Sequence, residues 1–229
     1  MGHKAKNVVR RAITSGRLGL GSHADNSLDF LGAMCVNQVL SPRSLRAAAG
    51  ARFAGVMGSG STFLAPVTAY PTTTLTMALW NGDPAGGRSY FIDRITAVVA
   101  SGTPVVGGAL LACVTTVAQA RPTLSTGGNG GYANTIISGL SGYKGGSSNG
   151  ILINAITLTG DQPAWFVAAH QPSNTATANI AATGFVAELD GGVLVPPGYM
   201  LGMAVLSAAG TTPLYSFGVT WDEVQADNE

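Results

Sequence analysis

Residues 193–223 read VLVPPGYMLGMAVLSAAGTTPLYSFGVTWDE, and this stretch decides the fold. In its second half, large apolar residues alternate with small or polar ones. The apolar positions are Tyr215, Phe217, Val219 and Trp221. A period of two places such a row on one face of a β-strand. Because an aromatic row of this kind needs a second sheet to bury it, the stretch predicts a layered β-fold.

The first half of the same stretch predicts a preceding strand, from Tyr199 to Leu206, that is covered on both faces. Its odd and even positions are both free of polar side chains, unlike those of the aromatic strand. The strand follows a Pro-Pro-Gly turn at residues 196–198, and a turn at residues 209–213 joins it to the aromatic strand. We expect the two strands to be adjacent. We also expect the aromatic row to close the sandwich against Ile95, Ala97 and Val99 or their neighbours.

Alternating patterns continue back along the chain to about residue 73. They predict strands over residues 73–80, 90–100, 105–117, 132–137, 151–158, 164–170 and 182–189. The third is too apolar for a half-exposed strand, so it is predicted to be central. With the closing stretch this gives roughly nine strands and no helical period between them, which is typical of an antiparallel β-sandwich or barrel.

Two details of this pattern make specific predictions. In the strand over residues 90–100, we expect Phe91, Ile95, Ala97 and Val99 to share a face, with Asp93 at its outer end. The turn residues 81–87, NGDPAGG, have the length of a longer hairpin loop.

Residues 1–62 are predicted to form an extended basic N-terminal arm, and residues 63–229 the β-sandwich domain. The arm contains possible short helices, one capped by Asp25 or Asn26 and one starting at Ser41-Pro42. Residues 55–62, GVMGSGST, are predicted to be a flexible joint, after which the strands begin. The charge is asymmetric: residues 1–52 have eight basic and two acidic side chains, whereas the remainder has four basic and nine acidic. This indicates an extension that binds an anionic partner.

The candidate partner-binding residues are five cations near the N-terminus. They are Lys4, Lys6, Arg10, Arg11 and Arg17. They could neutralise phosphates of a nucleic acid without reading its sequence, dock on an acidic protein neighbour, or stay solvated. No aromatic residue is interleaved with them, so base stacking is not indicated.

The composition favours a subunit of an assembly. Apolar residues make up 46% of the chain and charged ones 10%, against about 25% in an average protein. The longest apolar run, Val105 to Val114, is shorter than the roughly 20 residues of a membrane span, and no membrane partner is predicted. Cys35 and Cys113 are expected to be buried thiols in a chain made in the cytosol of its host. The basic N-terminus lacks the hydrophobic segment of a secretory signal.

Little in the sequence suggests catalysis, and we predict neither an enzyme nor a bound metal or cofactor. His3, His23 and His170 are scattered. The carboxylates that fall at or near turns are interpreted as solvated turn acids; they are Asp83, Asp93, Asp161, Glu188 and Asp190. Two Gly-rich loops, residues 125–134 and 141–150, contain Tyr132 and Tyr143 and could hold a sugar.

Two segments carry a family resemblance. Residues 75–100, LTMALWNGDPAGGRSYFIDRITAVVA, contain a W-N-x-x-x-G-type turn before an I-D-R-I strand. Residues 193–224 contain a V-x-P-G-type turn and end in W-x-E, at Trp221 and Glu223. In these motifs, residues 73–223 resemble the jelly-roll structural proteins of tailed-phage virions. The resemblance implies a jelly-roll sandwich and a virion subunit, often trimeric, attached to the head shell or tail; it carries over no catalytic residue.

The sequence thus favours a capsid-associated decoration subunit, a homotrimer that binds neighbouring subunits of the virion shell through its N-terminal arm. One alternative is a shell-forming jelly-roll capsid protein whose basic arm contacts packaged nucleic acid. Another is a receptor-binding or glycan-binding virion module. All three place the chain in a virion made in the host cytoplasm.

Overall fold

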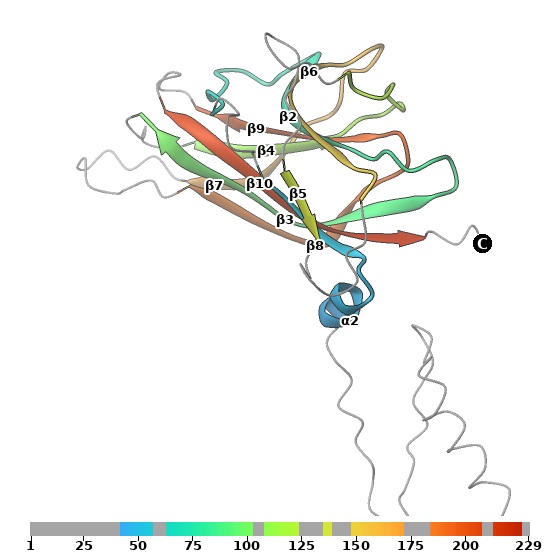
Figure 1. The fold of residues 1–229 in the computed structure, drawn as a ribbon. Coiled ribbons are helices and arrows are strands. Elements are labelled where there is room, and N and C mark those ends of the chain that lie inside the picture. The colour runs from blue at the N-terminus through green and yellow to red at the C-terminus, as the bar shows by residue number, and fades with distance from the viewer. Residues whose placement is uncertain are drawn as a thin grey trace, which may run out of the picture. The chain divides into compact units, whose positions relative to one another are not determined.

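A computed structural model describes residues 42–56, 63–102, 108–123, 135–138, 148–171, 184–207 and 213–225. All of them belong to the second of two units of the chain, Pro42–Glu229. Their elements are one helix and ten strands (Figure 1). The helix is α2 (Pro42–Ala48). The strands are β1 (Arg52–Val56), β2 (Thr74–Trp80), β3 (Arg88–Ser101), β4 (Gly108–Val114), β5 (Thr135–Ser138), β6 (Ile151–Thr157), β7 (Phe166–Gln171), β8 (Phe185–Val195), β9 (Met200–Leu206) and β10 (Leu214–Gln225).

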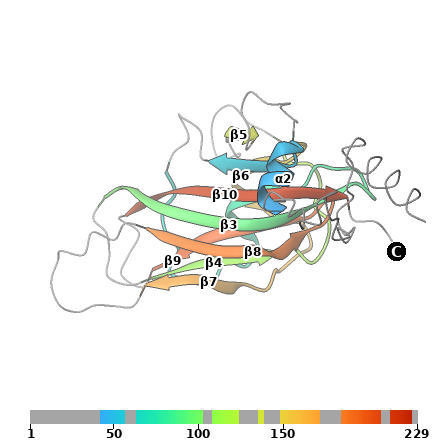
Figure 2. The same cartoon turned by 90° about the horizontal axis from the view of Figure 1, so that it is seen from below.

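The strands form two five-stranded antiparallel sheets that pack face to face (Figures 1 and 2). One, the β10 sheet, has the order β5-β1-β10-β3-β8. The other, the β9 sheet, has the order β6-β2-β9-β4-β7. The predicted all-β antiparallel sandwich is confirmed.

The strand order is that of a jelly roll. β1 pairs with β10, β2 with β9, β3 with β8 and β4 with β7, so the early strands pair with the late ones in reverse order. This nesting is what results when one long antiparallel hairpin is wrapped into two sheets. The remaining strands, β5 and β6, lie between β4 and β7 in the chain and add one strand to an edge of each sheet.

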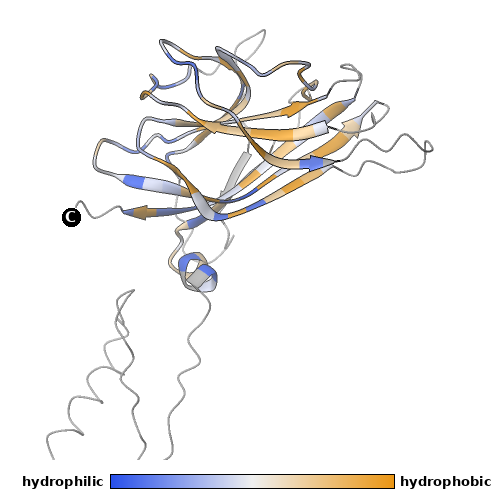
Figure 3. Ribbon diagram, turned by 180° about the vertical axis from the view of Figure 1, so that it is seen from behind, coloured by the Kyte–Doolittle hydropathy of each residue, from blue (hydrophilic) through white to orange (hydrophobic). Residues whose placement is uncertain are grey.

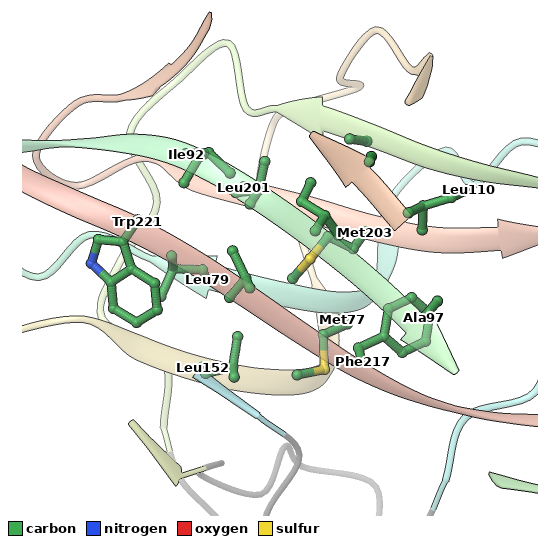
Figure 4. Close-up of a cluster of buried hydrophobic side chains, with 14 of the residues drawn as sticks. Met77, Leu79, Ile92, Ala97, Leu110, Leu152, Leu201, Met203, Phe217 and Trp221 are labelled. Atoms are coloured by element: carbon green, nitrogen blue, oxygen red, sulfur yellow. The ribbon is translucent and has the colours of Figure 1, made fainter. Parts of the chain in front are cut away.

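The aromatic row of β10 is buried between the sheets, as predicted. Phe217 pairs with Ala97 and Val219 with Ile95, so these neighbours lie beside the row in the same sheet. Across the core the row faces residues of the β9 sheet such as Met77, Leu79 and Met203 (Figure 4). The Trp221 ring stacks between two others, with centroid distances of 5.9 Å to Phe53 and 5.9 Å to Tyr90. In the ribbon coloured by hydropathy, the strands of both sheets contain long apolar stretches (Figure 3).

The expected adjacency of the last two strands is wrong. β9 lies in the β9 sheet and β10 in the other sheet, so the chain crosses the sandwich between them. The turn at residues 81–87 likewise connects β2 to β3 in opposite sheets and is no hairpin loop. In a jelly roll many turns cross between sheets, and a turn motif alone does not distinguish a crossing from a hairpin.

Strand β9 is covered on both faces, as predicted. Leu201 and Met203 point into the sandwich core. Met200 belongs to a second buried cluster on the other side of the β9 sheet, with Leu75 and Cys113. Burial raises the pKa of the Cys113 thiol to about 12, so the thiol stays protonated and inert. The predicted burial of Cys113 is confirmed, and Cys35 lies outside the described residues.

The first strand begins earlier than predicted, because residues 52–56 form β1 between β10 and β5. Gly55, interpreted as part of a flexible joint, is a strand residue under the Trp221 ring. A Cβ atom there would lie 3.2 Å from the ring carbon Cζ3 and 2.9 Å from Leu152 Cδ2. The helix predicted to start at Ser41-Pro42 is present as α2, whereas the helix predicted after Asp25 lies outside the described residues.

A β-bulge at Asp93 corrects the predicted inner face of β3. Thr220 pairs with Arg94 and Trp221 with Ile92, which leaves Asp93 as an extra residue. The bulge reverses the alternation, so Tyr90 and Ile92 point inward before it and Ile95 and Ala97 after it. Phe91 was expected to share the inner face, but it lies outside the core.

Candidate functional site

Six of the described charged side chains gather on the outer side of the β10 sheet, around two buried carboxylates. Asp93 comes from the bulge of β3, and Asp222 follows the aromatic row on β10. Their side chains are only 6% and 5% exposed. We call the contacts that these two residues make with the arginines of residues 42–52 the carboxylate clamp.

Three arginines complete the carboxylate clamp. Arg43 of α2 pairs with Asp93 at 2.8 Å and also with Asp190, which lies on β8. Arg46 of α2 pairs with Asp222 at 2.9 Å. Arg52 of β1 contacts both carboxylates, with its Nη2 on Asp93 and its Nη1 3.3 Å from Asp222. Guanidinium–carboxylate contacts of this kind fix α2 on the outer side of the β10 sheet (Figures 1 and 2).

Two of these acids project from irregular backbone. Asp190 has a positive φ of 49° and precedes Gly191 at 79°, where β8 bulges away from β3. The bulge of β3 at Asp93 faces this part of β8. Bulges redirect side chains that a regular strand would place elsewhere, so the two irregularities bring both acids to Arg43.

A second polar cluster joins a turn, a loop and the ends of two strands. Arg88 lies 3.2 Å from Asp83 and 3.1 Å from Glu223. Ser148 donates a hydrogen bond to Glu223, and Asn149 donates one to Asp83. Asp83 thus connects the turn before β3 to the start of β3 and to the loop at Asn149. Glu223 connects the end of β10 to the start of β3 and to Ser148 of the same loop.

Asn81 links the two turns that carry the family resemblance. Its side-chain amide donates to the carbonyl oxygens of Arg88 and Val195, both at 2.9 Å. Its backbone exchanges hydrogen bonds with Gly198 and Tyr199. The W-N-x-x-x-G turn and the V-x-P-G turn are thus packed on each other, and the asparagine satisfies the buried polar groups of both.

Burial changes the acid–base behaviour of this second cluster. It raises the pKa of Glu223, against the opposing effect of hydrogen bonds from Ser148 and Trp221 and of the Arg88 charge. It also raises the pKa of Tyr90, and the negative charge of Glu223 adds to the shift. Desolvation disfavours the charged form of either group. A buried acid that is engaged by Arg88, Ser148 and Trp221 is a structural link between elements.

The interpretation of the turn acids as solvated is wrong for three of the five. Asp83, Asp93 and Asp161 are buried and partnered. Asp161 accepts hydrogen bonds from the backbone N–H of Thr116 at 2.8 Å and from its hydroxyl at 2.6 Å. Glu188 is half exposed and pairs with Arg94 at 2.7 Å, and Asp190 is exposed.

The other residues singled out in the sequence fall into two groups. Lys4, Lys6, Arg10, Arg11 and Arg17 lie outside the described residues, as do His3, His23, Tyr132 and Tyr143. His170 is exposed near the end of β7. Among the described residues, no group of three His, Cys, Asp or Glu side chains is placed to hold a metal ion. In the same part of the chain, no helix has the length and hydropathy needed to cross a membrane.

Sequence reasoning missed the roles of Arg43, Arg46 and Arg52, which it counted with the basic arm, and of Ser148 and Asn149. One signal was available for Asp222. It follows Trp221 directly, so the period of two places it on the outer face of a strand whose other outward positions, such as Thr220, are uncharged. A lone acid there indicates a specific partner.

Comparisons with known proteins add little. No family model and no curated protein matches the sequence. A comparison of structures finds a chain of the cryo-EM structure of Mud Crab Dicistrovirus. It has 11% sequence identity and a TM-score of 0.22, over 90% of this chain and 84% of that chain. A TM-score this low carries no weight for fold or function.

Proposed function

We propose that this chain is a structural protein of a virion, a jelly-roll subunit of the capsid shell or attached to it. The observation that carries the proposal is the nested pairing of eight strands around a filled apolar core. Jelly rolls serve in viral capsids, lectins and cupins, so the fold alone does not choose among these. Only 10% of the residues are charged. This low charge content favours a capsid subunit over a lectin or cupin, because neighbouring subunits cover much of a capsid subunit's surface.

The outer side of the β10 sheet offers a surface for such neighbours. Val56, Gly218, Thr96 and Val186 lie in register across β1, β10, β3 and β8. The two valines are 43% and 58% exposed, and nearby Val98 is 48% exposed. An uncharged row across four strands can be covered by another subunit without burying a charge.

The proposal has two forms, which differ in the anionic partner that the five N-terminal cations bind. Every carboxylate among the described residues already has a cation or a hydrogen-bond donor beside it. These acids are Asp83, Asp93, Asp161, Glu188, Asp190, Asp222 and Glu223. A second copy therefore offers the five N-terminal cations no unpaired acid in this part of its chain.

The first form is a decoration subunit attached to the shell through its N-terminal arm, with another protein supplying the acidic surface; the resemblance to tailed-phage proteins supports it. The second is a shell-forming capsid protein whose basic arm contacts packaged nucleic acid. In this second form the phosphates of the nucleic acid are the anions that the five cations bind. Neither form gives the chain a catalytic role.

Expression of the full chain alone tests the two forms. If it forms the shell, closed particles are seen by negative-stain microscopy, and they contain nucleic acid that high salt releases. A chain without residues 1–22 would then form particles depleted of nucleic acid. If it decorates, the chain alone gives only small oligomers, and it binds preformed shells only when residues 1–22 are present. Oligomers that neither assemble nor bind shells would contradict the proposal.

A glycan-binding role makes a separate prediction. A glycan array that shows binding lost in Tyr132→Ala or Tyr143→Ala would support the receptor-binding alternative. Retained folding in the variant, checked by thermal unfolding, is the control.

A further inference from the structure

Helix α2 is attached to the β10 sheet through charge. Arg43 reaches Asp93 and Asp190, and Arg46 reaches Asp222 at 2.9 Å. Ala48 of the same helix is exposed, and Ala47 is half-buried. A helix of 7 residues is not stable alone in water, because the cost of nucleating it exceeds what so few hydrogen bonds return. The ion pairs of Arg43 and Arg46 therefore contribute to holding α2 in its docked position.

The carboxylate clamp retains a counter-charge when α2 leaves. Arg52 belongs to β1 and not to the helix, and it contacts both Asp93 and Asp222. Its side chain is 18% exposed, so it stays largely buried beside them. Leaving a buried carboxylate without a cation is strongly unfavourable, and Arg52 prevents this for both acids. Undocking of α2 thus does not require the sheet to open.

A pivot separates the helix from the strand. Gly50 has a positive φ of 72° and donates its N–H to Ala47, while Ala51 donates to Arg46. This is the left-handed glycine that commonly ends a helix. From Arg52 onward the chain is fixed between β10 and β5. The carbonyl oxygen of Ala51 accepts a hydrogen bond from the Glu223 N–H at 2.7 Å, so rotation at Gly50 moves α2 and leaves β1 in place.

We propose that α2 is an ionic latch, which docks on the carboxylate clamp at low ionic strength and detaches at high ionic strength while the sandwich stays folded. In the docked state Pro42, the first residue of α2, is held on the outer side of the β10 sheet. Detachment frees residues 42–50, which span roughly 30 Å at full extension. The latch does not depend on the proposed virion function.

Hydrogen exchange of the full chain tests the latch. Amide protection is measured by mass spectrometry in about 0.1 M and about 1 M NaCl, which shortens the screening length about threefold. We expect the protection of residues 46–51 to fall on the order of tenfold at high salt, because two partly exposed ion pairs are then lost. Protection of β3 and β10 should stay unchanged.

Three variants make the test specific. Arg43→Gln and Arg46→Gln should show the low protection of residues 46–51 already in about 0.1 M NaCl. The matched control is Arg94→Gln, which removes a guanidinium of the same sheet whose ion pair is with Glu188 and not with an acid that α2 pairs with. It should keep the wild-type response to salt.

Two outcomes would overturn the latch. In one, residues 46–51 keep their protection at high salt. In the other, they lose it only together with β3 and β10, which would make α2 a part of the folded sheet. The salt response of the wild-type chain decides between these outcomes even if a variant fails to fold.

Discussion

At the scale of single residues, the Trp221 ring and its neighbours leave little room for a side chain at Gly55. Gly55 faces this ring and Leu152, and a Cβ atom would come within 3.2 Å of the one and 2.9 Å of the other. Gly218 lies on the neighbouring strand and faces the other side of the sheet. A Cβ atom there would lie 2.8 Å from the Thr96 hydroxyl oxygen, and its other contacts would be at ordinary distances. A hydroxyl can rotate away, whereas an indole packed between two rings cannot.

Gly55→Ala is therefore expected to lower the free energy of unfolding by about 1–3 kcal/mol, the usual effect of overpacking a core. Gly218→Ala, the matched control, should stay within about 0.5 kcal/mol of the wild type. Urea denaturation of both variants measures the difference. Equal losses in the two variants would show that the space around Trp221 is not the limiting factor.

Glu223 gives a prediction on pH. Its pKa is raised by burial, so the folded protein holds this proton more tightly than the unfolded chain does. The stability that comes from the protonated form is present at low pH and is lost as the pH rises through the raised pKa. Relative to Glu223→Gln, which cannot ionise, the wild type should become less stable between about pH 4 and about pH 7. Urea denaturation across this range measures the gap, and a gap in favour of the wild type that grows with pH would contradict the prediction.

Single residues also show which features of the fold could be predicted from the sequence and which could not. The row of β10 was predictable because Phe217 and Trp221 keep a strict period of two. The inner face of β3 was not, because the bulge at Asp93 adds one residue and no local signal marks it. Buried acids such as Asp83 resemble solvated turn acids in sequence, since their partners are distant in the chain; Asn149, for example, is 66 residues away.

At the scale of elements, α2 and β1 share the carboxylate clamp unequally. Arg52 on β1 is largely buried and contacts both acids, whereas Arg46 on α2 is 33% exposed and contacts one. Removing one partner of a buried ion pair costs far more than removing an exposed one.

Arg52→Gln is expected to lower the free energy of unfolding by about 3 kcal/mol, because it removes the cation that both buried carboxylates share. Arg46→Gln should cost no more than about 1 kcal/mol. Chemical denaturation of the two variants gives the comparison. If Arg46→Gln were the more destabilising, α2 and not β1 would be the main partner of the sheet.

The elements themselves were largely predictable, because nine of the ten described strands follow from alternation and turn residues. β1 was not predicted, because its apolar run is short and contains Gly55, which was interpreted as the start of a flexible joint. The pairing of the strands was not predictable, since β1 finds its partner more than 160 residues later along the chain, at positions such as Asp222. Only packing of the whole core selects that partner.

At the scale of the whole molecule, the described ion pairs and both apolar clusters lie within residues 42–229. A chain that begins at Pro42 is therefore expected to unfold within about 2 °C of the full chain, as measured by calorimetry. The same truncation removes Lys4, Lys6, Arg10, Arg11 and Arg17. If the second form of the proposed function holds, it should also remove salt-dependent binding to single-stranded RNA, measured by fluorescence anisotropy. A large drop in melting temperature would show that residues 1–41 stabilise the domain.

The pairing of β1 with β10 also determines when this protein can fold. In the β10 sheet, β10 lies between β1 and β3, and it is the last of the described strands in the order of synthesis. A nascent chain that ends before Leu214 thus lacks the middle of one sheet and the indole that fills the space between Phe53 and Tyr90. Contacts between such distant segments slow folding and expose unpaired strands in the meantime. The domain can therefore complete its folding only once β10 has left the ribosome, and chains truncated before β10 are expected to aggregate.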